Sequence, residues 1–413
     1  MATVRTLLKE YPEVKLVDEI PPQPQDMFVQ VSLEKNAKEK YAPPDLKSLR
    51  YSGHGLTKKQ GLELQSCYRA LVLDFSHPKK YVWNGLRAAN AIVDALVQKI
   101  GGFAWDQETR EIFSSDAWHE RRVASWSGDV PDVTKQTVIH IYDNDHSVRA
   151  ITLGMLKMGL PDVTMNSSGW SSERQMGNLI NIFSQSLAEG APVRNTGNFR
   201  LSLHALRSSE FRDSQIKSIK GAGLGLACLS VKPGEWEEGD PKNRLIHLGA
   251  DKYPGADTDA QQESMISSFF GSEDAISHVK YNDELMAASA KAKAKLPELQ
   301  KAFIAGLEPS EFIDVKAPFR VENGGNEWMW VEVTKWKGDE IEGILENDPQ
   351  EIPELRAGQK VTVHQQDVFD YLHHLPDKST EGNTTGEIIR KMTGNEGGSR
   401  PVTGEITFPE CPD

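Results

Sequence analysis

The stretch EWMWVEVTKWKGDEIEGIL, residues 327–345, decides how the C-terminal part of this chain folds. Trp328–Thr334 is rich in aromatic and β-branched residues, and Ile341–Leu345 is a second short apolar run, so each segment predicts a strand. Gly338 lies between the two segments and predicts a tight turn. We therefore expect an antiparallel hairpin at this position.

Three more short strands are expected around the hairpin, at Phe312–Val315, Lys360–Val363 and Val368–Tyr371. Glycine-rich and Asn-Asp-Pro segments between them supply the turns. Because the edges of a small sheet need protection, we expect these strands to form a curled antiparallel sheet, a small β-barrel-like module.

The first two thirds of the chain alternate between strand and helix periodicity. A strand at Ala70–Phe75, an apolar helical stripe from Leu86 to Ile100 and a hairpin within 103–113 predict a ferredoxin-like split βαβ layer. A second unit is expected to begin with a strand at 138–141 and a helix that starts at Ser147. The predicted class is α+β. Further expected elements are a strand at 163–165, a helix from about 172 to Gly190, a strand at 199–206, a helix at 213–220, strands at 224–231 and 245–249, and a helix at 258–270.

A chain of 413 residues is too long for one ordinary core. Shifts in composition predict six segments. They are an irregular N-terminal arm (1–50), an α+β domain (51–195), a second α+β unit (196–281), a helical connector interrupted at Pro297 (282–307), a β-rich domain (308–393) and a flexible tail (394–413).

The formal net charge is -13, which disfavours binding to a phosphate backbone unless a basic stripe compensates. The most basic stretch, 290–301, has no interleaved aromatic residue and is typical of a solvated helix face. No apolar run approaches the roughly 18 residues of a membrane span. We therefore expect neither a nucleic acid nor a membrane as the partner.

The three cysteines lie far apart in the sequence and lack the spacing of metal ligands. Cys67 and Cys228 stand in apolar contexts and are interpreted as small core residues, and Cys411 lies near the end of the sequence. The first nineteen residues are too charged for a secretory signal. Together these features predict a cytoplasmic location.

The sharpest chemical cluster is His140, Asp143, Asp145 and His146, expected between a strand and a helix. Carboxylate and imidazole groups at this spacing could bind a divalent metal. Asp, Asn and Ser are also the residues that a strand-to-helix turn uses for capping, and this structural interpretation is favoured.

His119 and Glu120 form a second polar pair, which could act as acid and base. A solvated helix turn beside core tryptophans is the favoured alternative. His373-His374 is interpreted as a surface turn. The glycines of 221–225 follow a helix and precede a strand, the reverse of a dinucleotide fingerprint, so no cofactor is expected.

Trp328, Trp330 and Trp336 are the most suggestive binding feature. Residues two apart on a strand share a face, so Trp328 and Trp330 should project together and leave Met329 on the other face. One face is then expected to be covered by the interior of the module, and the other by a neighbouring domain, which is the favoured interpretation, or by a partner. Acidic residues around the tryptophans, Glu332 among them, suit a basic protein partner or serve solubility alone.

The segments Phe312–Lys316, Glu327–Val331, Gly343–Pro349, Leu355–Val361 and Asp367–Tyr371 resemble, in sequence and spacing, the YegJ-like family of uncharacterised bacterial domains. The resemblance covers 308–392, and Tyr371 replaces a tryptophan that is frequent in the family. The region 68–190 is similar to the part that accompanies this domain in longer bacterial relatives. The resemblance implies a soluble bacterial protein and brings no activity or catalytic residue.

The sequence thus favours a non-catalytic, protein-binding protein, and its acidity fits a role in bacterial immunity or defence. The alternative is a metal-dependent hydrolase that uses Asp143, Asp145 and His146.

Overall fold

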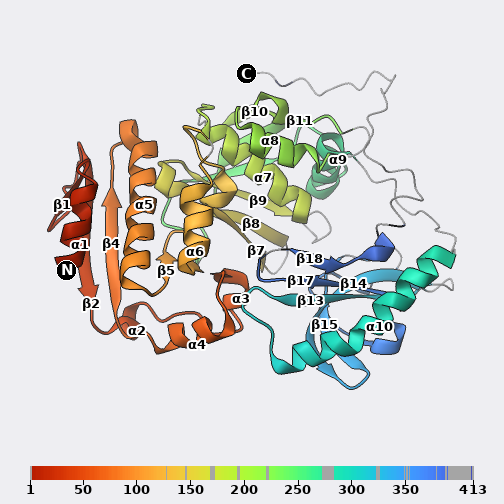
Figure 1. The fold of residues 1–413 in the computed structure, drawn as a ribbon. Helices are drawn as coiled ribbons and strands as arrows, with labels where there is room; N and C mark the ends of the chain where they lie inside the picture. The colour runs from red at the N-terminus through yellow and green to blue at the C-terminus, as the bar shows by residue number, and fades with distance from the viewer. Residues whose placement is uncertain are drawn as a thin grey trace.

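The structure, a computed structural model, describes residues 2–126, 128–144, 147–167, 173–192, 196–219, 223–271, 283–321, 326–347, 354–377 and 379–386, together with 349, 352, 388 and 411. In these residues the strands form two six-stranded and two three-stranded sheets, with helices packed on them (Figure 1). The α+β class predicted from the sequence is confirmed. The expected tail, 394–413, lies outside the described residues except for Cys411.

The C-terminal sheet contains the predicted hairpin and is antiparallel throughout. Its strand order is β16-β15-β14-β13-β17-β18, an open sheet, so the expectation of barrel-like closure is wrong. Helix α10 (Asp283–Ala305) covers the apolar face instead, with Leu296 and Leu299 packed against Val315 and Val331. The helix continues through Pro297, where a break was expected. The strands are β13 (Phe312–Arg320), β14 (Asn326–Lys337), β15 (Glu340–Leu345), β16 (Lys360–His364), β17 (Asp370–His374) and β18 (Thr380–Gly382).

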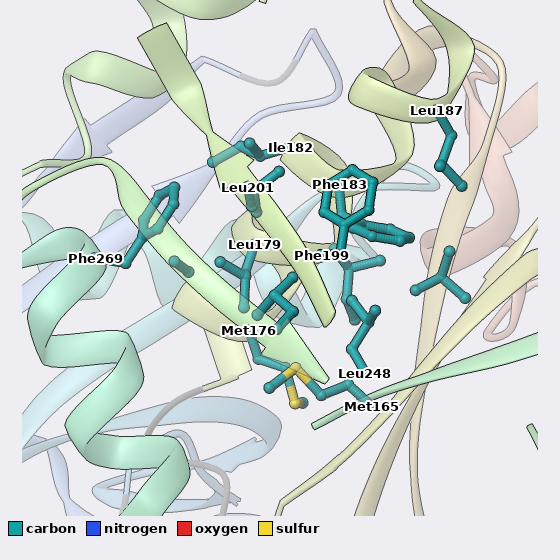
Figure 2. Close-up of a cluster of buried hydrophobic side chains, with 14 of the residues drawn as sticks. Met165, Met176, Leu179, Ile182, Phe183, Leu187, Phe199, Leu201, Leu248 and Phe269 are labelled. Atoms are coloured by element: carbon teal, nitrogen blue, oxygen red, sulfur yellow. The ribbon is translucent and has the colours of Figure 1, made fainter. Parts of the chain in front are cut away.

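The central sheet has the order β10-β11-β12-β9-β8-β7, and its β9–β12 pair is parallel. Helices α7 (Glu173–Ala188) and α9 (Thr258–Phe270) pack against it, and Figure 2 shows Met176 and Phe183 of α7 gathered with Phe269 of α9 over the strands. The helix predicted at 258–270 is confirmed. The strands are β7 (Val138–Asn144), β8 (Ser147–Leu153), β9 (Asp162–Ser167), β10 (Gly197–Ser202), β11 (Leu226–Pro233) and β12 (Leu245–Gly249); the short helix α8 (Ser209–Ile216) follows β10.

The helix expected from Ser147 is wrong, because this segment is strand β8, paired with β7 and β9. Its β-branched residues Val148, Ile151 and Thr152 are all buried, and such side chains pack well in a strand that is covered on both faces.

The ferredoxin-like split unit is also wrong, because its expected strands lie in two different sheets. Strand β4 (Ala70–Ser76) pairs with β2 (Met27–Glu34), which also pairs with β1 (Val14–Val17). Helix α5 (Val82–Ile100) packs on that sheet together with α1 (Ala2–Leu7). The expected hairpin that follows α5 lies in a separate small sheet, where its second strand pairs with residues 53–54. The second small sheet contains β3 (Gly53–His54), β5 (Ala104–Asp106) and β6 (Glu111–Phe113), and the remaining helices are α2 (Ala37–Lys40), α3 (Leu49–Ser52), α4 (Lys58–Ser66) and α6 (Ser115–Trp118).

A disulfide joins Cys228 in β11 to Cys411. Cys228 is fully buried, as expected for a core residue, but its sulfur is part of a disulfide, which the sequence analysis did not predict. Disulfides persist in oxidising compartments, so cysteine usage no longer favours the cytoplasm. None of the described helices combines the length and apolar character needed to cross a bilayer.

Asp162 places a fully buried carboxyl group at the start of β9. It accepts hydrogen bonds from Thr152 Oγ1 (2.9 Å), Asn243 Nδ2 (2.7 Å) and the amide of Met155 (3.3 Å). Burial outweighs these donors and raises the pKa of Asp162 to about 6.

We expect this carboxyl group to make the protein more stable in mild acid. The folded-state pKa exceeds the ordinary value of 3.8, so the stabilisation is complete below about pH 4 and is lost as the pH rises through about 6. A shift of this size corresponds to about 3 kcal/mol. Urea unfolding of the wild type should show this decrease in the free energy of unfolding between pH 4 and pH 7. The Asp162→Asn variant should not show it. Equal pH dependence in the two proteins would contradict the prediction.

Candidate functional site

The second face of the C-terminal sheet, opposite α10, carries the aromatic residues predicted to bind. Met329, Val331 and Val333 alternate into the core beneath α10, and Trp328 and Trp330 lie on the opposite face, as expected. Both indole side chains are half-buried. We call the part of this face that carries Trp328, Trp330 and their cross-strand neighbours Pro318 and Lys316 the tryptophan face.

Trp328 packs mainly within its own module. Its ring centroid lies 4.6 Å from that of Phe369, and the indole joins a cluster with Leu285 and Ala288 of α10 and Ile388. Trp330 has a basic neighbour. Its cross-strand neighbour Lys316 places Nζ 5.7 Å from the indole centroid, a cation–π contact, and burial lowers the pKa of that lysine.

Trp336 does not belong to the tryptophan face. A register shift between Val333 and Lys335 changes the alternation of β14, and the Trp336 side chain lies in the core at 5% exposure. Its Nε1 donates to Gln365 Oε1 at 3.0 Å. The three tryptophans therefore do not form one surface.

Glu332 is held by the N-terminal part of the chain. It forms an ion pair with Arg50, and both side chains are largely buried. Opposite Glu332 on β13, Asp314 accepts a hydrogen bond from His374 Nε2 at 2.9 Å. Glu332 is therefore part of the contact between the two parts of the molecule.

The interpretation of His373-His374 as a surface turn is wrong, because both residues lie in β17. His373 is buried and its Nε2 lies 2.7 Å from Glu311 Oε1, and the ring of His374 stacks on Phe312 at 3.9 Å. Both imidazoles help to fix strand pairing.

Two helix ends fasten the C-terminal sheet and α10 to the rest of the chain. The carboxylate of Glu308, just after α10, accepts a hydrogen bond from the amide of Lys58, the first residue of α4. Lys58 Nζ donates in return to the carbonyl of Ala305 at the end of α10, at 2.9 Å. An acid at a helix N-terminus and a base at a helix C-terminus both complement the helix dipole.

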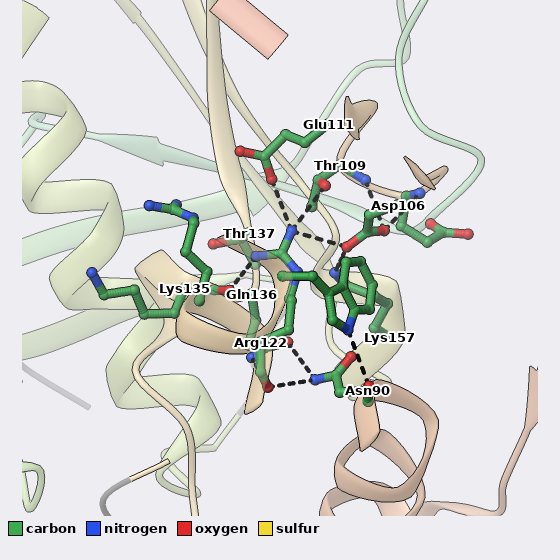
Figure 3. A network of polar contacts seen from close by, with 12 residues as sticks. Asn90, Asp106, Thr109, Glu111, Arg122, Lys135, Gln136, Thr137 and Lys157 are labelled. Carbon is green, nitrogen blue, oxygen red and sulfur yellow. Dashed lines mark hydrogen bonds and ion pairs between the residues drawn. The ribbon is translucent and has the colours of Figure 1, made fainter. Parts of the chain in front are cut away.

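A buried ionic network occupies the region that contains His119 and Glu120. Figure 3 shows Arg122 at its centre, with its guanidinium between Asp106, Thr109 and Glu111. Arg122 has no exposed surface and its Nη2 lies 3.0 Å from Asp106 Oδ2 and 2.8 Å from Glu111 Oε2. These groups are packed into the protein interior and stabilise the fold.

His119 and Glu120 lie in a π-helical turn (His119–Ala124) on the surface. His119 Nδ1 lies 2.8 Å from Asp94 Oδ2, with the imidazole half exposed. Glu120 is exposed as well, and neither residue lines the two best-formed pockets of the described chain. Their proposed acid–base role remains a prediction that the geometry does not favour.

His140 lines a small pocket beside β7, of about 160 Å³, with Arg110, Tyr142 and Asp240 among its walls. Asp145, His146 and the side chain of Asp143 lie outside the described residues. Among the residues that the structure describes, no three His, Cys, Asp or Glu side chains gather as metal ligands. The metal-dependent hydrolase hypothesis therefore gains no support here and stays untested.

Comparison with known families bears on the part of the chain that carries the tryptophan face. Residues 282–399 match the family described as uncharacterized protein conserved in bacteria (DUF2314). The DUF2314 region includes α10, which we expected to be a connector, together with the whole C-terminal sheet. The expected likeness to an uncharacterised bacterial family is thus confirmed for this region. No curated protein and no solved structure matches the chain.

Proposed function

We propose that this chain is a non-catalytic, protein-binding protein whose DUF2314 region, YegJ-like in its motifs, presents the tryptophan face to a protein partner. One observation carries the proposal: α10 fills one side of the C-terminal sheet, whereas Trp330 stays only partly buried on the other. Tryptophan is among the residues that contribute most to binding energy at interfaces.

The charge of the chain favours a basic partner, because a net charge of -13 steers cationic proteins toward it. A role in bacterial immunity or defence belongs to the same proposal. A cytoplasmic location also stays a prediction, and the Cys228–Cys411 disulfide counts against it.

The test uses the purified chain of 413 residues as bait in an extract of the cells that express it. We expect a specific partner to be recovered by the wild type and lost with Trp330→Ala, since removing a central indole commonly costs 1–2 kcal/mol or more. Thr362→Ala, an exposed change on the edge strand β16, is the matched control and should retain the partner. Identical recovery with all three proteins would overturn the proposal.

A further inference from the structure

Another tryptophan, Trp236, is far more exposed than those of the tryptophan face. Trp236 is 59% exposed and lies in the connection between β11 and β12. The segment Gly234–Asp240, sequence GEWEEGD, places an exposed Glu235 before this indole and an exposed Glu238 two positions after it. We call this segment the acidic loop. Most of this indole is therefore accessible to a partner.

One buried arginine hydrogen-bonds to three residues of the acidic loop. Arg149 of β8 is 3% exposed, and its Nη1 donates to Glu237 Oε1 at 2.8 Å. Its Nη2 donates to Asp240 Oδ2 at 2.8 Å and to the carbonyl of Glu235 at 2.9 Å. Such a fork fixes the backbone on both sides of Trp236.

Further bonds complete the anchoring. The hydroxyl of Tyr142 donates toward Glu237 Oε2 at 3.2 Å, and the amide of Glu237 donates to Asp240 Oδ2 at 2.9 Å. Arg110 donates to the carbonyl of Gly239 from a turn in which its φ is 60°, a left-handed conformation uncommon for a residue other than glycine. A loop held at positions 235, 237, 239 and 240 loses little conformational entropy when it binds, which favours affinity.

The side chains that remain exposed define the chemistry of a partner. An indole face attracts a lysine or arginine cation, and neighbouring carboxylates pair with the same charge. Residues 234–240 contain four carboxylates and no basic residue. Arg149 pairs with two of them, those of Glu237 and Asp240, and leaves Glu235 and Glu238 exposed. A pocket of about 160 Å³ beside the loop offers room for one side chain. Its walls are Arg110, His140, Tyr142, Ile151, Leu153, Glu238, Gly239 and Asp240.

We propose that the acidic loop is a second recognition surface, which binds a Lys/Arg-rich segment of a protein partner through Trp236, Glu235 and Glu238. The surface is independent of the tryptophan face, because it lies on the central sheet and shares no residue with the C-terminal module. Its affinity depends on charge and therefore falls with added salt.

The experiment uses the full-length protein and a fluorescein-labelled octapeptide of alternating arginine and glycine, followed by fluorescence anisotropy. We expect Trp236→Ala to weaken binding about tenfold, as loss of an interface tryptophan commonly does. Tyr68→Ala, which removes another exposed aromatic side chain (58%), should change the affinity less than about twofold.

A charge-matched pair separates local recognition from the attraction of the whole acidic chain. Glu235→Gln/Glu238→Gln should weaken binding and flatten its salt dependence, whereas Glu10→Gln/Glu13→Gln, which changes the net charge equally at exposed positions, should not. Trp330→Ala should bind the peptide as the wild type does. Equal weakening by both glutamine pairs, wild-type affinity in Trp236→Ala, or a dimer that depends on Trp236 would each overturn the proposal.

Discussion

Replacing Arg122 by methionine should lower the free energy of unfolding by about 3–5 kcal/mol, the usual cost of breaking a buried ionic network from one side. The guanidinium is fully buried and pairs with Asp106 and Glu111, and it also lies 4.6 Å from the ring centroid of Phe113. Methionine fills much of the space but leaves the two carboxylates with less compensation. Urea denaturation at neutral pH measures the loss.

Loss of Arg122 should also change the pH at which the protein unfolds in acid. Burial opposes ionisation of Glu111, but the hydrogen bond with His54 and the charge of Arg122 hold the pKa of Glu111 below its ordinary 4.5. A depressed carboxyl pKa stabilises the fold above that ordinary value, and the stabilisation is lost as the pH falls through the folded-state pKa. Arg122→Met should therefore unfold at a higher pH than the wild type does in an acid titration.

Two further variants test whether the buried charge causes the loss of stability in Arg122→Met. Arg121→Met changes the adjacent arginine, which is only partly buried and donates to the Thr134 carbonyl, and it should cost less than about 1 kcal/mol. Adding Glu111→Gln to Arg122→Met should recover part of the loss, because it removes one buried charge. If Arg121→Met and Arg122→Met are equally destabilising, buried charge is not the reason.

Loss of the Cys228–Cys411 disulfide should also have a large effect. The bond closes a loop of 183 residues, for which the chain-entropy model gives about 5 kcal/mol, with about 2–5 kcal/mol typical of measured losses. We expect Cys411→Ser to lower the unfolding temperature and to make the protein insensitive to added dithiothreitol.

Cys67→Ser is the control for the disulfide. Cys67 is a free, half-buried thiol whose pKa is raised by burial, so its replacement should leave stability nearly unchanged. Alkylation of the non-reduced wild type, followed by mass measurement, should label one thiol per chain, and reduction should expose three. Three reactive thiols before reduction would refute the bond.

Regular periodicity made much of the fold predictable. The hairpin of 328–345, the strand at 245–249 and the helix at 258–270 were all foreseen, because turn residues bound each of these segments. The spacing of Thr57 and Gln60 is also that of a capping box, and the structure contains one at the start of α4. Strand β8 was mistaken for a helix because a strand that is buried on both faces loses the two-residue alternation.

The polar parts of the structure were less predictable, because burial of a charge leaves no local pattern. The sequence analysis predicted His119 and Glu120 as the candidate functional residues of this region. The structure instead places Arg122 at the centre of the ionic network. The disulfide joins cysteines 183 positions apart, a distance that no local spacing rule spans. Trp236 was not predicted for a similar reason. Its loop is held by Arg149, which lies in strand β8 and is distant from Trp236 in the sequence.

The parallel pairing of β9 with β12 has a consequence for biosynthesis. Asp162 pairs with Leu245, so in a nascent chain in which only β7, β8 and β9 have formed, the edge of β9 that later receives β12 is still unpaired. That edge stays available to chaperones, or to another nascent chain, until β12 has been translated. Cys228 can form its disulfide only later, because its partner Cys411 lies 183 residues further along the chain.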